Sequence, residues 1–177
     1  ASNSGDFLMV GKGTLQFRKT ENLQLDVAEF EKLLALEFDS NLKSSRQIRI
    51  SNLEAAVALY DGGFLDGFYV DSPAFEEWLL FERHRLKESM LTALDSLATF
   101  HEDAGDLIKA QHYIRWQLRL EPYRETAHQC LMRVLALGGQ RGAAMDQYNS
   151  CRHILAQELG VAPSGATLTL FRQIRNG

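Results

Sequence analysis

Cysteine, proline and long apolar runs are scarce in this chain, and each scarcity excludes a class of protein. The 177 residues include two cysteines and three prolines. Cys130 and Cys151 stand in no CxxC or Cys/His zinc spacing and give no disulfide framework, which favours a reducing cytoplasm. No run approaches the roughly 18 apolar residues of a membrane span, and no signal peptide is recognisable. We therefore expect a cytoplasmic protein without a membrane-spanning segment.

An excess of positive charge is also missing. The net charge is -4 and the pI is near 5.7. Nucleic-acid binders usually have a basic face or a basic pI, so this balance argues against DNA binding by the chain itself, although a local basic patch remains compatible with it. The composition is that of an ordinary globular protein, and the length suits one domain, or one domain and a fragment.

The motifs of common enzymes and cofactor sites are absent from the sequence. It contains no GxSxG and no HExxH. The glycine-rich stretch "DGGFLDGFYVDS" (61–72) lacks the lysine of a phosphate-binding loop and follows a predicted helix rather than a strand. Its aspartates, Asp61, Asp66 and Asp71, are five residues apart, which does not fit a calcium loop. We expect no catalysis, no cofactor and no metal. His101 and His128 are interpreted as core or boundary residues, and both cysteines as small packing residues.

The first 25 residues read as β structure. Two short apolar runs, "FLMV" (7–10) and "TLQF" (14–17), flank a turn that contains glycine, which predicts a hairpin. Helical spacing begins after Asp26, where Asp26 and Glu29 nearly form a capping box. Residues 37–47 are polar and predict a loop. Ser51 and Glu54 form a second capping pair that predicts a helix over 52–60.

The glycine-rich stretch then predicts a corner between helices. Gly62 or Gly63 would cap the helix before it, and Ser72 would cap the helix that starts at Pro73. The apolar residues of the corner, Phe64, Leu65, Phe68 and Tyr69, would pack back onto the core. From Ala74 to about Asp103 neither proline nor glycine occurs, which predicts one long helix.

The rest of the chain contains an internal repeat. Residues 92–125 and 126–159 match at an offset of 34 residues without a gap, as Thr92 matches Thr126. Gly105 matches Gly139 at the predicted turns, and Ala110 matches Ala144 where two helices would pack closely. A helix–turn–helix unit of this period is typical of tetratricopeptide repeats. A final helix in 162–174 would cap the array. The predicted fold is mainly α: a tetratricopeptide-like α-solenoid of about seven helices (26–177) after a small β hairpin (1–25).

Three segments resemble the bacterial transcriptional activator domain, over roughly residues 23 to 175. They are "FEEWLLFERHRLKESMLTALDSLA" (75–98), "EPYRETAHQCLMRVLALGGQRGAAMDQY" (121–148) and "LAQELGVAPS" (155–164). This family is a tetratricopeptide-like helical module that follows a winged-helix DNA-binding domain in antibiotic regulatory proteins and larger regulators. The resemblance implies a non-catalytic regulatory domain that positions or dimerises the winged-helix domain, or contacts the transcription machinery.

The resemblance also implies that the N-terminal hairpin is the remnant of a winged-helix domain. No room exists before Phe7 for a recognition helix. We therefore expect a fragment of a longer regulator, rather than a natural protein without a DNA reader, and expect DNA contact only through a domain absent from this chain. The expected partners are proteins: the DNA-binding domain, the transcription machinery or a second copy. A homodimer would cover the unpaired edges of the hairpin.

Two candidate surfaces follow. First-helix positions of tetratricopeptide units line a partner groove; with the first unit beginning at Leu91, they are Thr92, Asp95, Thr99, Glu102, Thr126, Gln129, Arg133 and Ala136. The lysines and asparagines that hold a peptide carboxylate in related clamps are missing, which disfavours that ligand. Interdomain contact is expected at Phe64, Phe68, Arg83 and Arg124. The charged residues Arg83, Arg85, Arg124, Arg133, Glu82, Glu125 and Glu158 otherwise read as structural ion pairs, with Arg124 paired to an acid on the long helix.

Two other functions remain open at this stage. One is a stand-alone tetratricopeptide scaffold for a peptide or protein partner outside transcription. The other is an enzyme or ligand sensor that uses the glycine-rich corner, which a thermal shift with nucleotides or divalent ions would reveal.

Overall fold

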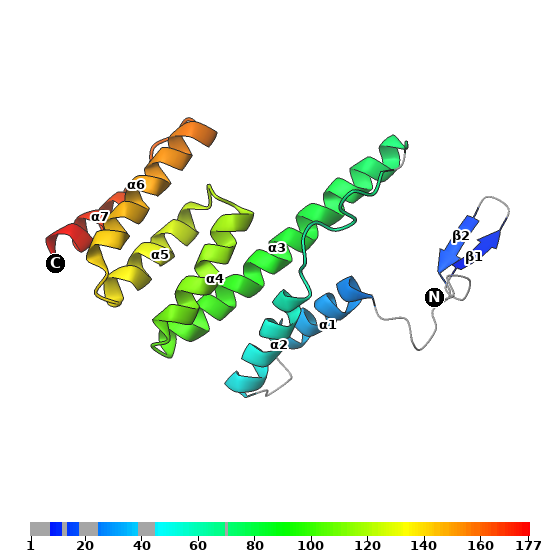
Figure 1. The fold of residues 1–177 in the computed structure, drawn as a ribbon, viewed down its shortest axis with the longest axis horizontal. Helices are drawn as coiled ribbons and strands as arrows, with labels where there is room; N and C mark the ends of the chain where they lie inside the picture. The colour runs from blue at the N-terminus through cyan, green and yellow to red at the C-terminus, as the bar shows by residue number, and fades with distance from the viewer. Residues whose placement is uncertain (1–7, 12–13, 18–24, 39–44, 70) are drawn as a thin grey trace.

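The computed structural model describes residues 8–11, 14–17, 25–38, 45–69 and 71–177. Within these ranges the chain forms seven helices and one two-stranded sheet, shown in Figure 1. The elements are β1 (Leu8–Gly11), β2 (Thr14–Phe17), α1 (Asp26–Phe38), α2 (Arg46–Ala58), α3 (Pro73–Asp103), α4 (Leu107–Leu120), α5 (Glu125–Leu137), α6 (Arg141–Glu158) and α7 (Gly165–Asn176). The predicted number of helices is confirmed.

The two strands pair antiparallel, with Leu8 opposite Phe17 and Gly11 opposite Thr14. The turn at 12–13 and the connection at 18–24 lie outside the described residues. The origin of this hairpin in a winged-helix domain stays a prediction.

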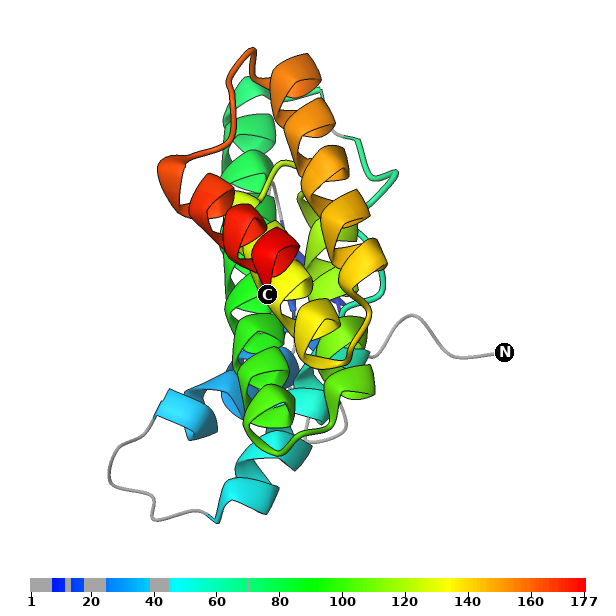
Figure 2. The same cartoon turned by 90° about the vertical axis from the view of Figure 1, so that its left-hand side faces the viewer.

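The helices stack as successive antiparallel pairs. α1 packs on α2, α3 on α4 and α5 on α6, and α7 contacts both helices of the last pair. Figure 1 shows this order, with the pairs following one another along the molecule and α7 at its end. In Figure 2, which faces that end, α7 lies in front of the other helices. One continuous apolar core joins the first five helices and reaches α6 at Ala144. A layered array of this kind buries each helix only against its neighbours, so no single pair encloses a core alone.

The two predicted glycine turns are confirmed and are alike. Gly105 has φ 75° and Gly139 has φ 71°, the left-handed region in which glycine carries no steric penalty. In each turn the residue after the glycine donates its N–H to a carbonyl five residues back: Asp106 to His101, and Gln140 to Leu135. This is the pattern of a Schellman helix end. The turns therefore set the same geometry in both units.

The small residues predicted at the close contacts are buried completely. Ala110 in α4 and Ala144 in α6 are both 0% exposed. A larger side chain at either position would push the two helices of a unit apart, because packing in protein interiors leaves few voids.

The second helix begins earlier than the sequence indicated. α2 starts at Arg46, where Ser45 is the N-cap and its side chain accepts a hydrogen bond from the Ile48 N–H. Ser51 lies inside the helix, so the capping pair predicted at Ser51 and Glu54 is wrong. Packing explains the difference: Arg46 donates to the Phe100 carbonyl oxygen at 2.6 Å, and its guanidinium lies 5.3 Å from the Phe100 ring centroid. This contact with α3 keeps a polar first turn helical.

The third helix is much longer than its partner. α3 has 31 residues and α4 has 14; at a rise of about 1.5 Å per residue the lengths are roughly 46 Å and 21 Å. Only the second half of α3 can therefore pair with α4. The first half, residues 73–85, projects beyond the other helices in Figure 1 and is called the arm below.

The chain reaches the arm through the corner segment, residues 59–72. Leu59, not a glycine, is the C-cap of α2, and Gly62 has φ 88° three residues later, so the predicted glycine cap is wrong. Pro73 opens α3 as predicted. Ser72 occupies the N-cap position, but its side chain makes no capping hydrogen bond.

Candidate protein-interaction surfaces

The predicted groove residues lie on α3 and α5, the first helices of the two repeat units. Thr92, Asp95, Thr99 and Thr126 are exposed. Asp95 also receives a long hydrogen bond, 3.5 Å, from the Gln117 side chain of α4. These four positions are accessible to solvent, and their predicted role in binding a partner stays a prediction.

An ion pair spans the two first helices. Arg133 of α5 donates from Nε and Nη2 to the two carboxylate oxygens of Glu102 in α3, at 2.7 and 2.9 Å. The geometry is bidentate, which adds directionality to the charge attraction. The hydrogen bond with Glu102 raises the pKa of Arg133, so the pair stays charged. Two of the predicted groove residues thus bind each other.

The final helix occupies part of the predicted groove. The Gln129 side chain donates to Thr167 of α7 at 2.7 Å, and Thr167 donates to the Glu125 carboxylate. Glu125 also accepts the Ser164 N–H at 2.7 Å. Thr167 is fully buried. Burial alone would raise the pKa of Glu125, but the hydrogen bonds from Thr167 and Ser164 outweigh it and lower that pKa. Gln129 therefore anchors α7 instead of facing an open groove.

The arginines expected to form structural ion pairs have separate partners. Arg85 binds Glu82 at 2.7 Å and Glu31 of α1 at 2.6 Å. Arg124 lies 3.7 Å from Glu121 at the end of α4, so its predicted pairing with an acid on the long helix is wrong. Glu121 is better placed, because α5 starts four residues after it.

Arg83 fixes the corner segment to the arm. Its Nε donates to the Phe64 carbonyl oxygen at 2.7 Å and its Nη2 donates to the Leu65 carbonyl oxygen at 2.8 Å. Leu65 has φ 50°, a conformation that L-residues seldom adopt. The two hydrogen bonds from a fixed guanidinium plane compensate for this local cost.

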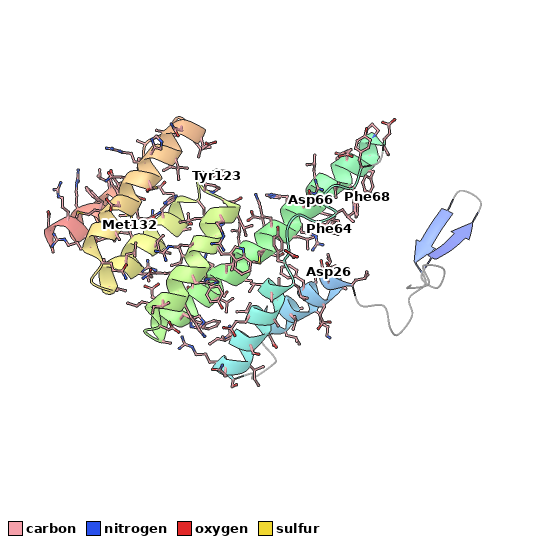
Figure 3. All side chains as sticks on the ribbon, viewed as in Figure 1. Asp26, Phe64, Asp66, Phe68, Tyr123 and Met132 are labelled. Carbon is pink, nitrogen blue, oxygen red and sulfur yellow. The ribbon has the colours of Figure 1, made fainter. Side chains whose placement is uncertain are left out.

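Two aromatic residues of the corner, Phe64 and Phe68, pack along the arm. Phe64 contacts Trp78 and Phe68 contacts Phe75, with ring centroids 6.0 and 5.7 Å apart; Figure 3 shows Phe64 and Phe68 beside the arm. Phe64 is half-buried and touches the core, as predicted. Phe68 and Tyr69 are 53% and 75% exposed and Leu65 is exposed, so their predicted return to the core is wrong. Phe68 packs against Phe75 instead, because the corner segment runs along the part of α3 that projects beyond the other helices.

The predicted core histidines are buried. His128 is held between the Pro122 carbonyl oxygen, 2.8 Å from Nε2, and Gln147, 2.6 Å from Nδ1. Burial lowers its pKa. His101 stacks on Tyr113 with ring centroids 5.5 Å apart. Burial also raises the thiol pKa of Cys130 and of Cys151, the latter to about 11, which suits packing rather than reaction.

Two exposed apolar features escaped the sequence reasoning. On the arm, Leu80 and Phe81 are 65% and 64% exposed, beside Trp78 at 46%. Between α5 and α7 lies a groove of about 500 Å³, with Ala136, Leu137, Leu170 and Ile174 in its lining. The first had a signal: "FEEWLLF" (75–81) places apolar residues on more faces than one helix contact can bury. The second depends on how α7 crosses α5.

The described ranges contain no group of three or more His, Cys, Asp or Glu side chains that could hold a metal ion. None of the helices in these ranges combines the length and the apolar character needed to cross a bilayer.

Comparison with known proteins identifies the family. The chain is similar in fold to Mycobacterium tuberculosis EmbR, solved in complex with a low-affinity phosphopeptide: the TM-score is 0.68 at 18% identity. The alignment covers 96% of this chain but only 43% of the EmbR chain, so this chain spans less than half of that protein. No curated protein matches the sequence. The profile of the bacterial transcriptional activator domain matches residues 25–175. The chain therefore belongs to the bacterial transcriptional activator domain family.

Proposed function

We propose that this chain is the non-catalytic interaction domain of a bacterial transcriptional activator, and that it positions or dimerises an adjacent winged-helix DNA-binding domain. The observation that carries the proposal is the family match over residues 25–175. The tetratricopeptide-like pairing of helices supports it, because such arrays present extended surfaces to protein partners. The acidic balance of the chain, with a net charge of -4, is consistent with leaving DNA contact to another domain.

The adjacent domain would dock at the corner segment. A cavity of about 160 Å³ lies between the start of α1 and the corner, lined among others by Val27, Phe30 and Phe64. A domain attached before residue 25 enters the molecule at this point. The exposed ring of Phe68 extends the same surface, and Arg83 holds the backbone of Phe64 in place. Arg124 is a less direct contact, because it is only partly exposed near the end of α4.

The proposal assigns sequence-specific DNA binding to the winged-helix domain and not to this chain, and this can be tested. We expect the chain alone to show no sequence-specific binding to promoter DNA, and the longer gene product with a winged-helix domain to bind. Fluorescence anisotropy with promoter and scrambled duplexes measures both. Specific binding by the chain alone at concentrations below about 1 µM would refute the proposal.

The docking surface has its own test in the longer gene product. Phe64→Ala with Phe68→Ala should reduce transcription from a reporter promoter without unfolding the domain. Tyr123→Ala, at an exposed aromatic residue elsewhere, is the matched control. Unchanged transcription in the double variant would remove the corner segment from the interface.

A further inference from the structure

The arm carries an apolar helix face that the described residues leave largely uncovered. Ala74, Glu77, Trp78 and Phe81 line one exposed hollow on α3. Their spacing, i, i+3, i+4 and i+7, puts them on one face of the helix. Leu80 and Phe81 are both nearly two-thirds exposed, which shows that the corner segment leaves this side of the arm open. Helix faces with anchors at this spacing bind into apolar grooves.

Charge in the corner segment and the first part of the arm has a single sign, while Arg83 and Arg85 at the base of the arm are bound by the Phe64 carbonyl oxygen and by Glu82 and Glu31. Residues 61–81 contain five acidic residues and no lysine or arginine. Two of the acids, Glu76 and Glu77, belong to the first turns of α3 itself. The surface that would receive the arm must therefore be apolar at its centre and basic at its edge.

The groove between α5 and α7 has this composition. Its lining includes four apolar side chains, Ala136, Leu137, Leu170 and Ile174, with Arg133 and Arg141 beside them. From residue 133 to residue 177 the chain has five arginines and two acidic residues. Arg133 is engaged with Glu102, whereas Arg141 at the start of α6 has no ion-pair partner among the described residues.

The arm and the groove cannot meet within one molecule. In Figure 1 the arm projects at one end of the array, and α7 with the C-terminus lies at the other. Contact between them requires a second copy. A contact between two different patches is heterologous, so it continues head to tail instead of closing as a two-fold dimer.

We infer that the arm of one copy inserts its Trp78–Phe81 face into the α5–α7 groove of a second copy, with Glu77 near Arg141. This inference specifies how the chain would self-associate, and it rests on that part of the proposed function alone. Opposite charges at the edge favour this orientation over arm against arm, where like charges would face each other. The associated fraction increases with protein concentration. The affinity decreases as salt screens the charges.

Sedimentation velocity of the whole chain tests the contact with two complementary variants. Leu80→Ser with Phe81→Ser blocks the arm, and Leu137→Asp blocks the groove; all three side chains are more than 60% exposed, so folding should persist. We expect the unaltered chain to associate between about 1 µM and 1 mM, and each variant alone to raise Kd at least about tenfold. An equimolar mixture of the two variants should form a one-to-one dimer and nothing larger, because one arm and one groove remain.

Each other result has a defined meaning. Ile108→Ser with Val161→Ser, at exposed apolar residues elsewhere, should leave association unchanged. A monomer throughout the concentration range, or a mixture that forms no dimer, would overturn the inference. If the arm variant instead weakens binding to the separately produced winged-helix part of the longer gene product, the arm belongs to that domain. The inference then fails while the proposed function stands.

Discussion

The two repeat units between Leu91 and Glu158 use the same turn twice, whereas the corner segment occurs once and is held by contacts from outside itself. Gly105 and Gly139 close the repeat turns with the same backbone hydrogen bonds. The corner depends on the Arg83 side chain and on aromatic contacts with the arm. The regular turns therefore belong to the part of the chain with the buried core, and the irregular corner segment belongs to the exposed surface. In this domain the corner segment and the arm leave Phe68, Tyr69, Leu80 and Phe81 exposed.

The largest expected effect separates the core of the repeats from the arm. Leu131 in α5 is 2% exposed, so Leu131→Ala should lower the free energy of unfolding by about 3 kcal/mol through lost burial and the cavity it leaves. Leu80→Ala removes the same atoms from a side chain that is 65% exposed. It should change the free energy of unfolding by less than about 0.5 kcal/mol. Urea unfolding followed by circular dichroism measures both. Equal losses would mean that the arm is packed as tightly as the repeats.

The attachment of α7 should show the next largest effect. Glu125→Ala leaves the Ser164 N–H and the Thr167 hydroxyl without their charged acceptor, at a cost of about 2 kcal/mol. Faster hydrogen exchange in α7 than in α5 would identify the loss as local. Glu158→Ala, at an exposed carboxylate of α6, is the control. Intact protection of α7 in the Glu125 variant would contradict the role given to this carboxylate.

Equivalence of the two repeat turns predicts equal, smaller effects. Gly105→Ala and Gly139→Ala each put a Cβ on a residue with φ above 70°, which should cost about 1 kcal/mol in both cases. Gly142→Ala has open space in the first turns of α6 and should be neutral or slightly stabilising. Thermal unfolding of the three variants is sufficient. A clear difference between the first two would end the equivalence.

The smallest effect concerns pH and the buried histidine of the second unit. Burial lowers the folded-state pKa of His128, so the unfolded chain binds a proton more readily. The stability that the neutral ring contributes is complete above the unfolded pKa, near 6.5, and is lost as pH falls through the lower folded pKa. His128→Gln removes this titration. The free energy of unfolding of this variant should fall less steeply from pH 7 to pH 5 than that of the unaltered chain. Parallel curves for the two proteins would contradict the prediction.

Local signals predicted the repeats well. The offset from Thr92 to Thr126, the paired glycines and the buried alanines are all short-range features, and the structure contains each of them. The start of α3 at Pro73 follows from the same kind of signal. Propensity and turn chemistry agree with the fold at these positions, which is the condition under which sequence reasoning succeeds.

Long-range contacts explain the failures. The sequence offered Ser51 as a cap, but contacts between Arg46 and Phe100 keep α2 helical from Arg46 onwards. Gln129 looked like a groove residue, yet α7 returns to bind it across 38 positions of sequence. The residues adjacent in sequence to Arg46 and to Gln129 do not indicate that these side chains bind Phe100 and Thr167.

The sequence by itself determined the helical repeat, its turns and its family, because spacing and glycine conformation are properties of adjacent residues. Only the tertiary structure decided which surfaces stay open. The length of α3 beyond α4 leaves the arm unpaired, and the crossing of α7 over α5 fills one stretch of groove and forms another. Exposure depends on which helix ends first and on where the last helix lies, and both are set by packing between distant segments.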